Sequence, residues 1–223
     1  MTLFLWDIDG TLISTGGAGR SALDRAFEEL HGVSEGFQKV HFGGRTDPGI
    51  VADAFRLAGL ELQEGDTTRL LRHYLPLLEQ RLRARTPTIH PGVHAALDLT
   101  GALGVNALLT GNWSEGARHK LRSVDLWGRF QLGAYGDDSP IRNELVPVAR
   151  ERARSQGIDV GEVVVIGDTL ADIACARAGG AHAVVVDTGW STTEELRAAA
   201  PDLFVSDLCA PEFGAYISGL AAK

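Results

Sequence analysis

The sequence has little cysteine, no long apolar run and no excess of positive charge. Its 223 residues include two cysteines, Cys175 and Cys209, so disulfide bonds are not expected to hold the fold together and a reducing cytoplasm is the expected location. The first apolar run, Leu3–Trp6, stops at Asp7 and is typical of a strand, not of a signal peptide. No segment approaches the roughly 20 apolar residues of a membrane helix. The formal charge of −8 argues against a nucleic-acid partner.

The overall composition, with 44% hydrophobic and 22% charged residues, is that of a folded domain. Short apolar runs recur, each followed by a helical pattern. This arrangement is typical of strands buried in a parallel sheet with helices on both faces. The runs are Leu3–Trp6, Val105–Leu109, Val163–Ile166, Ala183–Val186 and Leu203–Val205. We therefore predict an α/β fold with a doubly wound, Rossmann-like parallel sheet.

A long insertion separates the first two of these runs. It spans roughly a hundred residues, too many for one ordinary crossover connection. Three segments inside it carry apolar residues at helical spacing, namely residues 21–30, 48–58 and 67–85. Pro76 is expected to kink or divide the third of them. We predict an all-helical cap over residues 15–88, inserted into a core made of residues 1–14 and 89–223.

Acidic residues follow two of the predicted strands. Residues 7–11 read Asp-Ile-Asp-Gly-Thr, and Gly167–Asp172 follows the strand at Val163–Ile166. Open α/β sheets bind their ligands at the carboxyl ends of the strands. Either segment alone is also explained by helix capping. Together they bring three or four carboxylates to one place, which requires a cation, and Mg²⁺ suits such ligands beside a phosphorylated substrate.

A third polar segment, made of Thr110, Gly111 and Asn112, ends the strand at Val105–Leu109. It supplies a hydroxyl, an amide and free backbone N–H groups at the start of a helix. We predict that these residues bind phosphate. The alternative is an ordinary turn in which Asn112 or Ser114 caps the following helix.

In this order, the motifs resemble those of the haloacid dehalogenase superfamily of phosphohydrolases. Residues 7–11 are similar to its first motif, Thr110 to its second and Gly167–Asp172 to its fourth, each directly after a strand. The inserted helical cap is similar to that of the phosphoglycolate phosphatase and β-phosphoglucomutase branch. Residues 44–47, Gly-Arg-Thr-Asp, resemble the cap-loop signature of that branch and make Arg45 a candidate substrate-binding residue.

The resemblance implies a Mg²⁺-dependent phosphatase that acts on a small phosphorylated metabolite, such as phosphoglycolate, through an aspartyl-phosphate. Asp7 would be the nucleophile and Asp9 the general acid and base. The metal would be held by Asp7, the backbone carbonyl of Asp9 and Asp168, with Asp172 behind them or reaching the metal through water. A sugar-phosphate mutase of the same fold, and a non-enzymatic phosphoacceptor or scaffold module, are the alternatives.

The third motif departs from the commonest pattern, which has a lysine just before a helix upstream of the fourth motif. The matching segment here, residues 138–144, offers Arg142. Lys120 is the competing cation, but it is expected roughly 12 Å along the helix that begins near Asn112, and therefore too far from the phosphate. We predict that Arg142 is the catalytic cation and that Lys120 lies behind the substrate-binding residues. A solvated surface charge is the alternative for either side chain.

Overall fold

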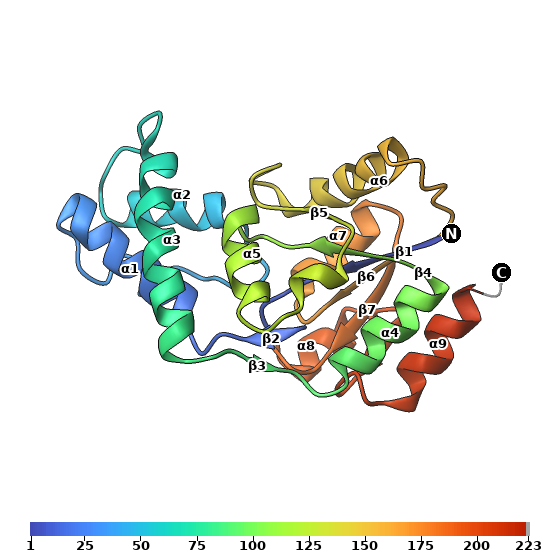
Figure 1. Ribbon diagram of the computed structural model, residues 1–223. Coiled ribbons are helices and arrows are strands. Elements are labelled where there is room, and N and C mark those ends of the chain that lie inside the picture. Colours follow the sequence, from blue (N-terminus) through green and yellow to red (C-terminus); the bar gives the residue numbers. More distant parts are fainter. Residues whose placement is uncertain (222–223) are drawn as a thin grey trace.

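The computed structural model describes residues 1–221 and shows a parallel sheet with helices on both faces (Figure 1). The order of its strands is β5-β4-β1-β6-β7-β8, and every neighbouring pair is parallel. The strands are β1 (Thr2–Trp6), β4 (Gly104–Leu109), β5 (Leu132–Ala134), β6 (Val163–Gly167), β7 (His182–Val186) and β8 (Leu203–Val205). The predicted fold class is therefore confirmed.

Five of these strands coincide with the apolar runs of the sequence, and β5 does not. It has three residues, Leu132–Ala134, and pairs only with β4 at the edge of the sheet. A segment this short, with Gly133 at its centre, has neither a β-branched run nor a detectable alternation. The sequence therefore gave no signal for the edge strand.

The sheet separates two hydrophobic clusters, because successive side chains of a strand point to opposite faces. Phe4 and Trp6 of β1 pack with α4, α5 and α9, whereas Leu3 and Leu5 pack with α6, α7 and α8. The helices are α4 (Val93–Leu103), α5 (Ser114–Arg122), α6 (Leu145–Ser155), α7 (Leu170–Ala178), α8 (Thr193–Ala198) and α9 (Pro211–Ala221). Two single turns of 3₁₀ helix, η1 (Trp127–Arg129) and η2 (Arg142–Glu144), lie between them in the chain.

Between β1 and β4 the chain leaves the sheet and forms three helices, which lie to one side of it (Figure 1). These are α1 (Ala18–His31), α2 (Asp47–Leu57) and α3 (Asp66–Ala84). They enclose a third cluster, centred on Phe27 with Phe37 and Phe55 at ring distances of 5.5 and 5.1 Å. Where the segment begins and ends, β2 (Ile13–Ser14) pairs antiparallel with β3 (Thr88–Ile89).

Pro76 does not divide the third helix of this segment, since α3 runs from Asp66 to Ala84 around it. The proline is exposed, so the carbonyl that lacks an N–H partner can bond to water. The buried stripe of the helix includes Tyr74 and Leu78 and continues past the proline. Packing of that stripe compensates for the missing hydrogen bond.

Within residues 1–221, no helix combines the length and the apolar character needed to cross a membrane.

Candidate active site

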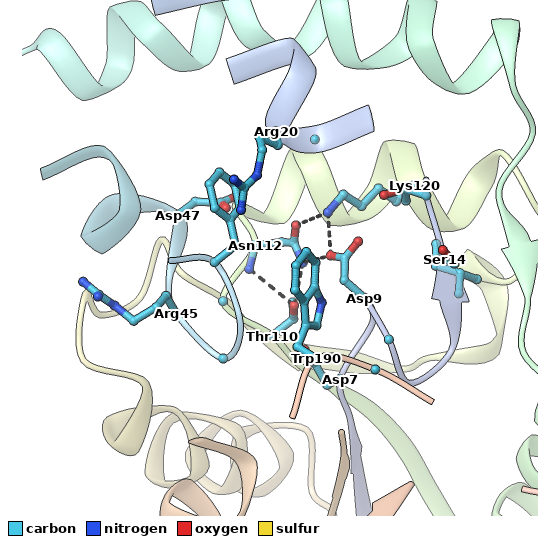
Figure 2. A pocket seen from close by; sticks show the side chains of 18 of the residues that line it. Asp7, Asp9, Ser14, Arg20, Arg45, Asp47, Thr110, Asn112, Lys120 and Trp190 are labelled. Carbon is cyan, nitrogen blue, oxygen red and sulfur yellow. Dashed lines mark hydrogen bonds and ion pairs between the residues drawn. The ribbon is translucent and has the colours of Figure 1, made fainter. Parts of the chain in front are cut away.

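A cavity of about 340 Å³ lies between the carboxyl edge of the sheet and the three inserted helices (Figure 2). The sheet contributes polar side chains that follow β1 and β4, and the segment after β7 contributes Trp190. The inserted segment contributes side chains from α1, α2, α3 and the loop before α2. The predicted site residues that line it are Asp7, Asp9, Arg45, Thr110, Gly111, Asn112, Lys120 and Arg142.

A first group of side chains, the Arg142 cluster, consists of Asp7, Asp168, Asp172 and Arg142. All four residues are at least nine-tenths buried. The three carboxylates offer oxygen atoms that lie within 4.8 Å of one another. A guanidinium nitrogen of Arg142 lies 3.1 Å from Asp7 Oδ1 and also pairs with Asp172 Oδ1. The predicted acidic residues are thus together, with Arg142 between two of them.

Burial raises the pKa of two of these carboxyl groups. Desolvation raises the pKa of Asp7 to about 6, against the opposing charge of Arg142. The pKa of Asp168 is well above its ordinary value, first because of burial and then because of the neighbouring Asp7 and Asp172 charges. The single positive charge of Arg142 is not enough to keep these neighbouring buried carboxylates ionised together, so they need additional positive charge. The electrostatics of the cluster therefore favour a bound cation.

The hydrogen bonds around these oxygens indicate which of them are free to bind a metal. Asp172 Oδ2 accepts from the backbone N–H and hydroxyl of Thr169 and completes the capping box of α7. Asp168 accepts from Thr11 at 2.9 Å and from the backbone N–H of Trp190 at 3.0 Å, which orients it. Between backbone groups of the described residues, no hydrogen bond reaches the Asp9 carbonyl. The Asp7 carboxylate accepts from the backbone N–H of Ile8 in addition to its contact with Arg142. The hard oxygen donors present fit Mg²⁺.

A second group, the Lys120 cluster, consists of Asp9, Asn112, Lys120 and Asp47 (Figure 2). The Nζ atom of Lys120 lies 2.5 Å from Asp9 Oδ2 and 2.6 Å from Asn112 Oδ1. The Asn112 amide donates to Asp9 Oδ2 at 2.9 Å and to the hydroxyl of Thr110 at 2.8 Å. Asn112 therefore does not cap α5, and the capping alternative for this residue is wrong.

The structure contradicts the expectation that Lys120 is too far away to reach the site. That expectation measured distance along the helix axis, roughly 12 Å at 1.5 Å per residue. Side chains of an α-helix lean toward its N-terminus, and the lysine stem adds several ångströms of reach in that direction. In addition, α5 begins at Ser114. Lys120 is only 5% exposed and ends at Asp9, so the solvated surface charge is excluded for it.

The loop before α2 joins the inserted segment to the sheet. Thr46 caps α2, and the backbone N–H of Asp47 donates to the carbonyl of Gly111 at 2.7 Å. A Cβ atom at Gly111 would overlap the carbonyl of Arg45, so glycine is required there for the loop to approach. The Arg45 side chain lies at the cavity, is 41% exposed, and pairs with Asp53 at 2.9 Å.

Sequence reasoning missed Asp47, Arg20 and Tyr74. Asp47 is buried, accepts from the backbone N–H of Trp113 at 2.8 Å, and has a pKa that burial raises to about 6, against the charge of Lys120. Asp47 is part of the cap-loop resemblance at residues 44–47, but an acidic residue at the start of a helix is also explained by its favourable interaction with the helix dipole. Arg20 and Tyr74 lie in amphipathic helices, where nothing in the pattern distinguishes them.

Comparisons with known proteins agree with this geometry. A family model described as HAD-hydrolase-like matches residues 143–211. The chain is 28% identical to a probable phosphatase, IndB, of Dickeya dadantii, with 91% of this chain and 88% of the relative covered. It is 27% identical to a phosphoglycolate phosphatase of Neisseria meningitidis, again with 91% and 88% covered.

Solved structures show the same fold. CbbY from Rhodobacter sphaeroides in complex with phosphate superposes with a TM-score of 0.72 at 19% identity, covering 92% of this chain and 94% of that one. A putative β-phosphoglucomutase from Thermotoga maritima has a TM-score of 0.62 at 16% identity, covering 99% and 100%. The family model matches residues 143–211, the curated relatives are named as phosphatases, and buried carboxylates follow β1 and β6. The chain is therefore a phosphatase that is similar to the haloacid-dehalogenase-like hydrolases.

Proposed function

We propose that this phosphatase is Mg²⁺-dependent and hydrolyses a small, phosphoglycolate-like phosphomonoester through an aspartyl-phosphate at Asp7. The observation that carries the proposal is the position of Asp7, which is buried after β1, paired with Arg142 and open to the cavity. The cavity of about 340 Å³ fits a small molecule.

Both cysteines are free, in agreement with a reducing cytoplasm.

In this mechanism Asp7 and Asp168 would hold the metal with their carboxylates, and Asp9 would do so with its backbone carbonyl. When bound, Mg²⁺ supplies positive charge that screens the repulsion between the nucleophilic carboxylate and the phosphate oxygens. Asp172 stays behind this set, because Thr169 and Arg142 already engage both of its oxygens. Arg142 orients Asp7 and stabilises negative charge on the transferring phosphoryl group.

The carboxylate of Asp7 attacks phosphorus, and the bond from phosphorus to the ester oxygen breaks. Asp9 protonates the departing alkoxide, then takes a proton from the water that attacks the aspartyl-phosphate and releases inorganic phosphate. The Thr110 hydroxyl accepts from Asn112, so its own hydrogen remains free to donate to a phosphoryl oxygen. Backbone N–H groups at the Gly111 turn and the Arg45 side chain complete the binding of the substrate.

Lys120 acts on the reaction through Asp9. Lys120 and Asn112 both contact Asp9 Oδ2, which leaves Oδ1 as the oxygen that exchanges a proton. The lysine therefore positions the general acid and base, while Arg142 serves the nucleophile. The two cations have different tasks, and neither replaces the other.

The inserted segment, residues 15–88, acts as a cap over a core of residues 1–14 and 89–223. Its contacts with the sheet edge, from Asp47 to Gly111 and Trp113, close the cavity on that side. Closure excludes water that would compete during formation of the aspartyl-phosphate. The paired strands β2 and β3 connect the two parts.

The test is the release of inorganic phosphate from phosphoglycolate by the purified full chain, with Mg²⁺ and after its removal by EDTA. We expect turnover only with the metal, and restoration when Mg²⁺ is added back. Product analysis with a hexose 1-phosphate as a second substrate separates the alternatives, since a mutase would form the isomeric hexose phosphate and a phosphatase would release inorganic phosphate. Turnover that is unchanged by EDTA would contradict the metal-dependent mechanism.

A further inference from the structure

Four Lys and Arg side chains line the cavity, and they differ in whether a carboxylate neutralises them. Three are paired: Arg142 with Asp7 and Asp172, Lys120 with Asp9, and Arg45 with Asp53. The fourth is Arg20 on α1, which forms no ion pair with any residue in the described part of the chain. A cation at the wall of a partly closed cavity without a counter-ion favours the binding of an anion.

The surroundings of Arg20 hold its guanidinium in place without neutralising it. The guanidinium lies over the ring of Phe42, 4.3 Å from the ring centre. Its two terminal nitrogens are 3.5 and 3.4 Å from the backbone carbonyls of Gln38 and Val40, which are long distances for hydrogen bonds. Stacking on an aromatic ring fixes the plane of the guanidinium and leaves its N–H edges available.

Arg20 lies on the side of the cavity opposite the nucleophile (Figure 2). Asp7 and Thr110 follow strands of the sheet, whereas Arg20 projects from the inserted helix α1. The helix passes close to the site, since a Cβ atom at Gly19 would lie 3.6 Å from Lys120 Nζ. A small substrate with its phosphoryl group at Asp7 therefore extends toward Arg20.

We propose that Arg20 binds a second anionic group of the substrate, a carboxylate or a second phosphate, while the reacting phosphoryl group lies at Asp7. This inference rests on the proposed phosphatase function and adds the residue that binds the second anionic group of the substrate. An anionic group taken from water into the cavity needs a positive partner. Arg20 offers that partner, and its planar guanidinium matches the geometry of either anion.

The experiment compares three esters of similar size under the same Mg²⁺ concentration. Phosphoglycolate carries a carboxylate, ethylene glycol bisphosphate carries a second phosphate, and 2-hydroxyethyl phosphate carries neither. The variants are Arg20→Met, which removes the charge but keeps a long unbranched side chain, and Arg20→Lys, which returns the charge alone. Arg25→Met is the matched control, because Arg25 is on the same helix but pairs with Glu28 and Glu29 at the surface.

We expect Arg20→Met to lower kcat/KM roughly 10- to 100-fold for one or both anionic esters, mainly through KM, and to spare 2-hydroxyethyl phosphate. The ester that loses more identifies the second anion. Arg20→Lys recovers part of the loss, and Arg25→Met matches the wild type. An equal loss for all three esters, or no loss, would overturn the role of Arg20 and leave the phosphatase proposal intact. A wild type that hydrolyses none of them would overturn both.

Discussion

The Arg142 cluster and the Lys120 cluster each place a cation against a carboxylate of the proposed mechanism, but they are built from different parts of the chain. The Arg142 cluster comes entirely from the sheet side, from the end of β1, from η2, from the turn after β6 and from the first turn of α7. The Lys120 cluster includes Asp47, which belongs to the inserted segment. The first cluster therefore needs no contribution from the insertion, whereas the second is complete only when the loop before α2 lies against Gly111.

This difference indicates that separate parts of the molecule position the groups of the two proposed chemical steps. The proposed nucleophile and metal ligands lie at strand ends, which are rigid because both faces of the sheet are covered. The position of Asp9, the proposed general acid and base, depends in part on where the insertion lies. Substitutions at Asp7, Arg142, Lys120 and Asp47, with Asp9→Asn as a comparison for Lys120, test these roles from the largest expected effect to the smallest.

Asp7→Asn should abolish turnover and the formation of aspartyl-phosphate. The amide has nearly the shape of the carboxylate but is a poor nucleophile, so the fold should remain. Phosphate release and acid-stable phosphoryl labelling measure the chemistry, and thermal unfolding measures the fold. Substantial activity in a folded sample that mass spectrometry shows to be free of deamidation would exclude Asp7 as the nucleophile.

Arg142→Ala should damage both activity and stability, because it leaves the buried Asp7 and Asp172 without a counter-charge. We expect a loss of roughly 10- to 150-fold in kcat/KM and of about 3–5 kcal/mol in the free energy of unfolding. Arg142→Lys should recover part of each. The matched control is Arg154→Ala, whose partner Glu151 is as exposed as Arg154 itself. Equal behaviour of Arg142→Ala and the control would contradict the assignment.

Lys120→Met should lower kcat roughly 10-fold for an alkyl phosphate and much less for an aryl phosphate with a good leaving group. The reason is that the variant misplaces Asp9, whose proton an activated leaving group hardly needs. Asp9→Asn should show the same dependence with a larger loss, roughly 10²- to 10⁴-fold for the alkyl ester. Arg118→Met, an exposed position on the same helix, is the control. A loss that is equal for both esters would argue for a purely structural role of Lys120.

Asp47→Asn should change mainly the pH dependence of stability. Burial raises the pKa of Asp47 in the folded state to about 6, above the ordinary 3.8. The folded protein therefore holds this proton more tightly than the unfolded chain does, and its contribution to stability is present below pH 4 and lost as the pH rises through 6. Asparagine does not ionise but keeps an oxygen for the Trp113 N–H.

The measurement for Asp47 is the difference in free energy of unfolding between Asp47→Asn and the wild type, by urea denaturation at pH 4 and pH 8. The difference in free energy of unfolding, variant minus wild type, should be roughly 1–3 kcal/mol larger at pH 8 than at pH 4. Asp53→Asn is a useful comparison, because Arg56 and Arg45 lower the pKa of that partly exposed acid. A gain of the same sign for both variants would contradict the burial of Asp47.

Much of the sheet and part of the site follow from local sequence. Apolar runs bounded by Asp7 and Asp168 predicted strands whose carboxyl ends meet, and the structure places both acids in one buried cluster. This works because the pattern of a buried strand and the position of its end are encoded within a few residues. The short edge strand β5 lacks such a pattern, and its place in the sheet depends on pairing with β4 and packing against α6.

Only the tertiary structure decided which partners are reached by long side chains and by side chains from elements far apart in the sequence. The identity of Lys120 and its place on a helix were readable, but its contact with Asp9 depends on the direction in which the side chain leans and on how α5 packs. The burial of Asp47 and the unpaired charge of Arg20 both depend on how the inserted helices lie over the sheet. Spacing along the chain records the local geometry of each element, whereas these contacts arise from the packing of elements that are far apart in sequence.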